Sequence, residues 1–146
     1  MPPILLFLLS ILLVVPPASA EVVLESPWLR ESAPNQPNAA IYLRLRNAGA
    51  APVVLKGARV EGAKSAAVHE HRSEGGMMRM GEAPAQTIAP GAGLAFEPGG
   101  LHLMVFGLQA PVKAGSELPF CLDFEGAEPV CARARVVPLG GHAHEH

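Results

Sequence analysis

Charged and aromatic residues are both scarce in this sequence. Asp, Glu, Lys and Arg make up 16% of the 146 residues, and Phe, Trp and Tyr only 5%. The formal net charge is −2 at pH 7, and the 11 Lys and Arg residues form no basic stripe along the chain. Proteins that bind nucleic acid usually present such a stripe. The composition therefore excludes nucleic acid as the expected partner.

Helical periodicity and the common catalytic motifs are also missing. The sequence contains no G-x-S-x-G, no H-E-x-x-H and no glycine-rich phosphate loop. The run His69-Glu70-His71 is too short for the zinc-protease pattern, in which two histidines stand four residues apart on a helix. We therefore expect a binding protein rather than an enzyme.

The first twenty residues have the pattern of an export signal. Residues 4–15 form an apolar run of twelve, which is too short to span a bilayer as a helix. Ala18-Ser19-Ala20 follows as an A-x-A cleavage pattern. We predict a signal peptide over residues 1–20, cleavage after Ala20 and a periplasmic protein, with an uncleaved membrane anchor as the alternative. No cysteine stands near the expected cut, so a bacterial lipid anchor is not expected.

Alternation of apolar and polar residues runs through the chain that remains. Residues 41–46 read Ile-Tyr-Leu-Arg-Leu-Arg, which is typical of a strand with one face in a core and one near water. The 15 Gly and 15 Pro residues break the chain into short pieces. About nine short strands in one domain, residues 21–138, predict an all-β sandwich or barrel. The further strand candidates are 22–30, the segment that starts at 53–55, 64–71, 77–81, 93–97, 101–107, 117–124 and 130–137.

Cys121 and Cys131 are the only two cysteines. In an exported protein such a pair forms a disulfide by default. A hairpin centred on Gly126 would place the two residues directly opposite each other, close enough to bridge. The alternative is a dithiol that binds copper or takes part in redox exchange.

One predicted strand carries two soft metal ligands. In residues 101–107 the alternation places His102 and Met104 on the face opposite Leu103 and Val105. An imidazole and a thioether then point the same way, two residues apart. This pair forms half of a metal site.

The other half of the site comes from residues 69–80. His69 and His71 share one face of an extended segment, as Met78 and Met80 do in theirs, and Glu74-Gly75-Gly76 can turn the chain into a hairpin. The sequence has five methionines, and the four that follow the initiator Met1 all lie in or beside the proposed site. Imidazole with thioether suits Cu(I). Spacing alone does not separate His69 from His71 or Met80 from Met78.

Histidine and methionine also have more ordinary roles in a strand protein. Taken singly, a methionine is most often core filler, and a histidine in a strand is usually hydrogen-bonded or solvated. Zinc sites prefer thiolate, imidazole or carboxylate ligands. A blue-copper centre needs two histidines, a cysteine and a weak axial methionine, but no histidine follows either cysteine before position 142. The ligands of a blue-copper centre are therefore missing.

At this point the chain resembles a known family, the periplasmic copper chaperones of the PCu(A)C type. The resemblance rests on His-x10-Met-x21-His-x-Met, matched by His69, Met80, His102 and Met104, and extends over about residues 22–137. The supporting segments are Pro27-Trp28-x-Arg30, Ala40-x-Tyr42-Leu43, Pro98-Gly99-Gly100 and Gly107-Leu108.

The resemblance implies a cupredoxin-like Greek-key sandwich that holds Cu(I) through these four side chains, with His69 preferred over His71 and Met80 over Met78. It also implies delivery of copper for cytochrome c oxidase assembly, either to the CuA subunit directly or with a Sco-type thiol protein. We expect the protein to be a monomer. Cys121 and Cys131 depart from the family pattern and leave a thiol role open.

Three further histidines stand in the C-terminal segment 139–146, which we expect to be a flexible tail. His142, His144 and His146 could hold Cu(II), because that ion favours imidazole nitrogen. Secondary roles at His71 and Met78 also stay open. The alternative function is a periplasmic buffering or resistance protein that sequesters Cu(I) and Cu(II) without a dedicated recipient.

Overall fold

The computed structural model describes residues 20–141. The predicted signal peptide, apart from Ala20, and the three tail histidines lie outside the described residues, so these predictions stay open. Within residues 20–141 no helix is long and apolar enough to cross a membrane.

All regular elements of the described chain are strands, which confirms the all-β class. There are ten rather than about nine. The strand that the sequence did not reveal is β6, whose three residues between Pro84 and Pro90 are too few for alternation to show. The strands are β1 (Val22–Arg30), β2 (Ala39–Asn47), β3 (Val53–Val60), β4 (Ser65–Glu74), β5 (Met77–Glu82), β6 (Gln86–Ile88), β7 (Gly93–Phe96), β8 (His102–Phe106), β9 (Glu117–Glu125) and β10 (Val130–Val137).

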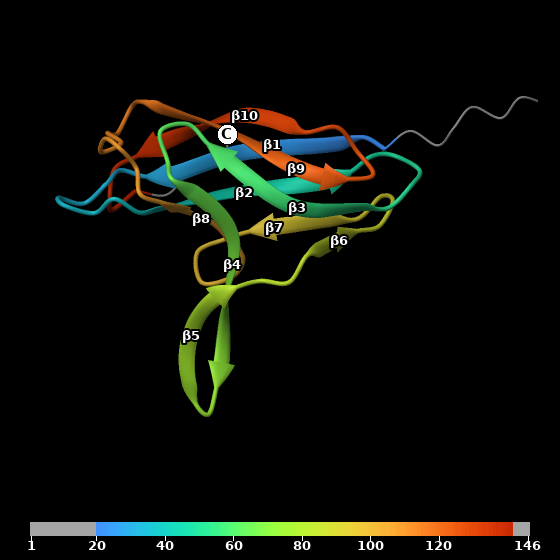
Figure 1. Ribbon diagram of the computed structural model, residues 1–146, viewed down its shortest axis with the longest axis horizontal. Helices are drawn as coiled ribbons and strands as arrows, with labels where there is room; N and C mark the ends of the chain where they lie inside the picture. The colour runs from blue at the N-terminus through green and yellow to red at the C-terminus, as the bar shows by residue number, and fades with distance from the viewer. Residues whose placement is uncertain (1–19, 142–146) are drawn as a thin grey trace, which may run out of the picture.

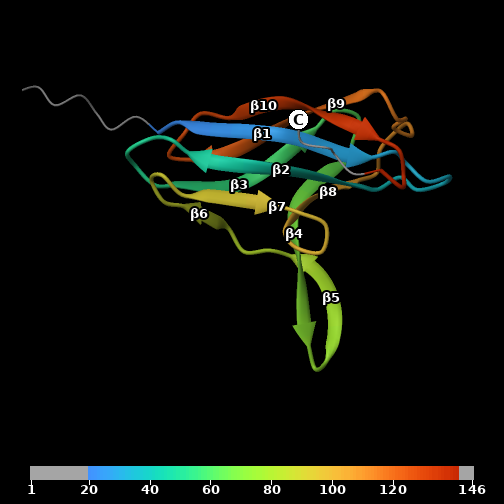
Figure 2. The same cartoon turned by 180° about the vertical axis from the view of Figure 1, so that it is seen from behind.

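The strands pair in the order β5-β4-β8-β2-β1-β10-β9-β3-β6, and β7 pairs with β2. Every pair is antiparallel except β1 with β10. Figures 1 and 2 show a flattened body from which the β4–β5 hairpin projects. The buried core draws on eight strands, and neither β4 nor β5 contributes a fully buried side chain. The hairpin is therefore an appendage of the core rather than a part of it.

Strand β8 joins the core to this appendage. Leu103 and Val105 are fully buried in the core. Since side chains alternate along a strand, His102 and Met104 lie on the other face of β8, as the sequence predicts. The core packing of β8 therefore fixes the two soft ligands that it carries.

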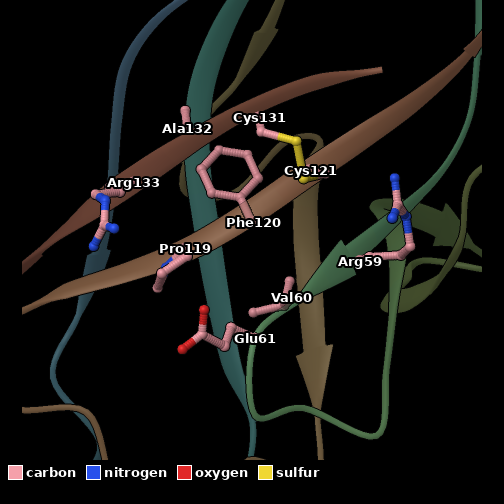
Figure 3. Close-up of a pocket in the computed structure, with 9 residues that line it drawn as sticks. All are labelled: Arg59, Val60, Glu61, Pro119, Phe120, Cys121, Cys131, Ala132 and Arg133. Carbon is pink, nitrogen blue, oxygen red and sulfur yellow. A yellow bond between two sulfur atoms is a disulfide. The ribbon is translucent and has the colours of Figure 1, made fainter. Parts of the chain in front are cut away.

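The structure contains a disulfide between Cys121 and Cys131. The two residues are paired directly across β9 and β10, with a Cα–Cα distance of 4.0 Å, and Gly126 in the connecting turn has a φ of 87°. A hollow of about 460 Å³ lies beside the disulfide, between Arg59 and Arg133 (Figure 3). None of the predicted metal ligands within residues 20–141 lines this hollow.

Removing the disulfide is expected to destabilise the domain. A crosslink across a separation of 10 residues restricts the unfolded chain, and its loss should lower the free energy of unfolding by about 2–3 kcal/mol. Urea unfolding of a Cys121→Ala, Cys131→Ala double variant measures this loss. Reductant should weaken the parent protein by a similar amount and leave the double variant unchanged. Equal urea midpoints for parent and variant would contradict the prediction.

Candidate metal centre

Strands β4 and β8 place two pairs of side chains on one outer face. His69 is paired with His102, and Ala67 with Met104. Directly paired residues of an antiparallel sheet point to the same side. Because the buried Leu103 stands between His102 and Met104, this common side is the one turned away from the core.

The β4–β5 hairpin extends the same face outward. His71 is paired with Met80, so both lie on the side of the sheet that carries His69. The turn is formed by Gly75 and Gly76 with φ values of 59° and 81°. Positive φ at both central residues is the requirement of a type I′ turn, which fits the twist of a two-residue hairpin. The glycine pair therefore fixes the register that sets Met80 opposite His71.

The centre of the site is a contact between His102 and Met80. The distance from His102 Nε2 to Met80 Sδ is 3.1 Å, although the two residues are separated by strand β4. The other ring nitrogen, Nδ1, lies 3.0 Å from the carbonyl oxygen of Gly100. A carbonyl oxygen only accepts hydrogen bonds, so Nδ1 carries the proton and Nε2 presents its lone pair. A nitrogen lone pair then faces a thioether sulfur, which is an arrangement suited to a soft cation.

His69 lies beside His102, its partner across β4 and β8. Its ring centroid is 6.0 Å from that of His102 and 5.4 Å from that of Phe106. Nδ1 of His69 is the only buried side-chain nitrogen or oxygen in residues 20–141 without a hydrogen-bond partner. A buried polar atom without a partner destabilises a fold. A metal ion at this position would give the nitrogen a partner.

Burial also keeps His102 in the form that binds metals. His102 is only 3% exposed. Burial lowers the pKa of His102 below its ordinary value; the hydrogen bond to Gly100 acts against this, and the neighbouring His71 and His69 lower the pKa further. Neutral imidazole, not imidazolium, is a metal ligand.

The remaining predicted ligands lie on the same face as this centre and differ in how exposed they are. Met104 is half-buried and is paired with alanines on both sides, Ala67 of β4 and Ala40 of β2. The His71 ring is exposed, and its centroid is 5.4 Å from that of His102. Met78 lies one position farther out on the same face, paired with Ser73. Contacts thus join Met80, His69 and His71 to His102, while Met104 and Met78 lie on the same face, Met78 farther out on the hairpin.

Nitrogen and oxygen ligands alone do not make a site here. Within residues 20–141, no group of three or more His, Cys, Asp or Glu side chains is placed to hold a metal ion. Cys121 and Cys131 are held in their disulfide on β9 and β10, separated from β8 by β2 and β1. A metal ion held on this face therefore needs the methionine sulfurs.

Two supporting contacts were not predicted from the sequence. Phe106 lies on the ligand face of β8, two residues beyond Met104, and its packing against His69 depends on how β4 and β8 pair. The Gly100 carbonyl that orients His102 belongs to the turn Pro98-Gly99-Gly100, in which Gly99 has a φ of 84°. A Pro-Gly-Gly run is typical of a turn, but the direction of its carbonyl does not follow from the sequence.

Comparison with protein families gives one match that covers most of the domain. Residues 22–136 match the LpqE-like family, described as putative lipoprotein LpqE-like. A putative lipoprotein, Lxx21020 from Leifsonia xyli subsp. xyli, is 35% identical over 81 residues, which are 55% of this chain and 49% of that protein. The match thus spans about half the length of this curated relative.

Solved structures with the same fold include copper-related domains. The apo PCuAC domain from PmoF1 superposes with a TM-score of 0.68 at 27% identity, covering 80% of this chain and 93% of that domain. The solution structure of CuI-DR1885 from Deinococcus radiodurans gives 0.62 at 27% identity, covering 85% of this chain and 80% of that one. The prediction of a PCu(A)C-type, cupredoxin-like fold is therefore confirmed.

Proposed function

Because the chain belongs to the LpqE-like family and has the fold of PCuAC domains, we propose that it binds Cu(I) and carries it as cargo. The family description as a putative lipoprotein supports an exported protein, and we propose the periplasm as its compartment. The names of two similar structures, the PCuAC domain from PmoF1 and CuI-DR1885, support copper as the ion.

The observation that carries the proposal is the 3.1 Å approach of His102 Nε2 to Met80 Sδ. We assign His69 and Met104 as the other two ligands. His69 offers a buried nitrogen without a partner, and Met104 stands two residues from His102 on the same face. Two neutral imidazoles and two thioethers are a soft, uncharged set that suits Cu(I).

Delivery proceeds by ligand exchange and needs no catalysis. A site without thiolate leaves the copper complex with a charge near that of Cu(I) itself, and a partner that offers thiolates can take the ion because soft thiolates bind Cu(I) strongly. We propose the CuA subunit of cytochrome c oxidase, or a Sco-type thiol protein, as the recipient. Buffering of copper without a recipient is the competing function, and it would require several tightly bound ions per chain.

Titration with Cu(I) against a competing chelator tests the proposal, with X-ray absorption to identify the neighbouring atoms. We expect one tightly bound ion with two sulfur and two nitrogen neighbours, since the site combines thioether with imidazole. Nitrogen neighbours alone, or unchanged spectra after the methionines are replaced, would refute it.

Acid is expected to weaken Cu(I) binding. Protons compete with the metal for imidazole nitrogen, whose ordinary pKa is about 6.5. Because the pKa of His102 lies below its ordinary value, its nitrogen stays available to a lower pH than that of an exposed histidine. Affinity should therefore change little from pH 8 to 7 and fall as the pH decreases below the ordinary histidine pKa of about 6.5. Thioethers do not titrate, so an affinity independent of pH would exclude the histidines as ligands.

The histidines of the tail are expected to bind Cu(II) separately. Deleting residues 139–146 removes His142, His144 and His146, and it should reduce Cu(II) binding while leaving Cu(I) affinity unchanged, because only Cu(I) depends on the methionines. Equilibrium dialysis with each ion measures both effects. A loss of Cu(I) affinity on deletion would contradict the assignment.

A further inference from the structure

We propose a second Cu(I) position on the β4–β5 hairpin, formed by His71 and Met78 and sharing Met80 with the inner site. This outer position is the route by which the ion enters and leaves. The inference rests on the proposed function of the inner site and adds a path to it.

The hairpin register places these side chains in one row. Met80 is paired with His71, and Met78 with Ser73. The diagonal neighbours on the same face of an antiparallel pair lie about 7–8 Å apart at the backbone, within reach of long side chains. His71 and Met78 are such neighbours. The Met80 sulfur contacts His102 Nε2, so Met80 belongs both to this row and to the inner site.

The exposed fraction rises along this row toward the tip of the hairpin. His102 is 3% exposed, Met80 51% and Met78 67%. The hairpin projects from the body of the domain in both views (Figures 1 and 2). Exposed methionines are uncommon, because the side chain is apolar. A partner would therefore meet Met78 before it could reach His102.

The two faces of the hairpin differ in chemistry. The face opposite the ligands carries ion pairs, Arg72 with Glu70 and Arg79 with Glu74, the latter with a distance of 3.8 Å between nitrogen and oxygen. Met77 lies on this charged face because it is adjacent to Met78 in the strand. It is 60% exposed, close to the 67% of Met78. The chain thus provides its own control, a methionine of similar exposure outside the row.

Transfer along the row is an exchange of ligands around one ion. As a bond from copper to Met78 or His71 forms, the bonds to the inner ligands break, while Met80 stays bound to the ion throughout. Copper keeps its oxidation state, and no proton or electron is transferred, because thioethers and neutral imidazoles bind the ion and dissociate from it in the same neutral form.

Methyl-labelled methionine NMR with anaerobic Cu(I) tests the proposal on the whole chain. The first equivalent of copper should shift the methyl signals of Met80 and Met104. Further copper should shift that of Met78 and leave that of Met77 in place. Unshifted Met80 and Met104 signals would refute the inner site itself. Shifts of these two with no difference between Met78 and Met77 would overturn only the outer position.

Transfer rates give the second readout. Stopped-flow removal of Cu(I) by a coloured chelator should slow several-fold in Met78→Leu and stay at the parent rate in Met77→Leu. The equilibrium affinity of the inner site should be the same in both variants and in the parent protein. Equal transfer rates in the two variants would overturn the proposal.

Discussion

Replacing Met80 with leucine is expected to lower Cu(I) affinity by more than about tenfold. Losing a residue that only hydrogen-bonds to a metal ligand can already lower affinity by about that much. Leucine keeps most of the volume of methionine but has no sulfur to place beside His102 Nε2. Met80 is 51% exposed, so the change removes little core packing and the fold should persist. Competition with a Cu(I) chelator measures the affinity, and urea unfolding measures the stability.

Met77→Leu is the matched control for this experiment. Met77 is 60% exposed on the same strand but points to the opposite face, so its replacement should leave the affinity unchanged. Met104→Leu should reproduce the loss seen with Met80→Leu. If Met80→Leu binds Cu(I) as tightly as Met77→Leu does, the assigned ligand set is wrong.

Replacing Leu103 with alanine is expected to lower the free energy of unfolding by about 2–5 kcal/mol. Leu103 is fully buried and stands between His102 and Met104 in β8. The substitution removes apolar contacts and leaves a cavity in the core. For a domain whose total stability is about 5–15 kcal/mol, this loss is large. Urea or thermal unfolding without copper measures it.

Leu139→Ala serves as the control for the core substitution. Leu139 is 49% exposed, and surface substitutions usually change stability by less than about 0.5 kcal/mol. Cu(I) should raise the stability of the Leu103→Ala variant, since a ligand that binds only the folded state shifts the equilibrium toward it. If the two variants unfold at the same urea concentration, Leu103 does not hold β8 in the core.

The chemistry of the site could be predicted from the sequence because it depends on local patterns. Alternation alone places His102 and Met104 on one face of a strand, and two consecutive glycines mark the turn of the β4–β5 hairpin. The Cys121–Cys131 pairing followed in the same way from a turn at Gly126. In each case residues close in sequence are held by geometry that repeats every two residues.

The choice among neighbouring ligands needed more than local pattern. His69 and His71 share a face, as Met78 and Met80 do, so alternation treats each pair as equivalent. Spatial pairing distinguishes them: His69 lies directly across from His102, whereas His71 lies across from Met80. This difference is what suggests an inner and an outer position.

By itself, the sequence determined the strand class, the soft ligand types and which face of each strand carries them, since all three follow from side-chain chemistry and a period of two. Only the tertiary structure decided that β4 pairs with β8, so that Met80 Sδ approaches to 3.1 Å from a histidine 22 residues away. Strand pairing depends on which buried faces can share one core, and that is a property of the whole chain. The soft ligands could therefore be identified one strand at a time, whereas the site that they form could not.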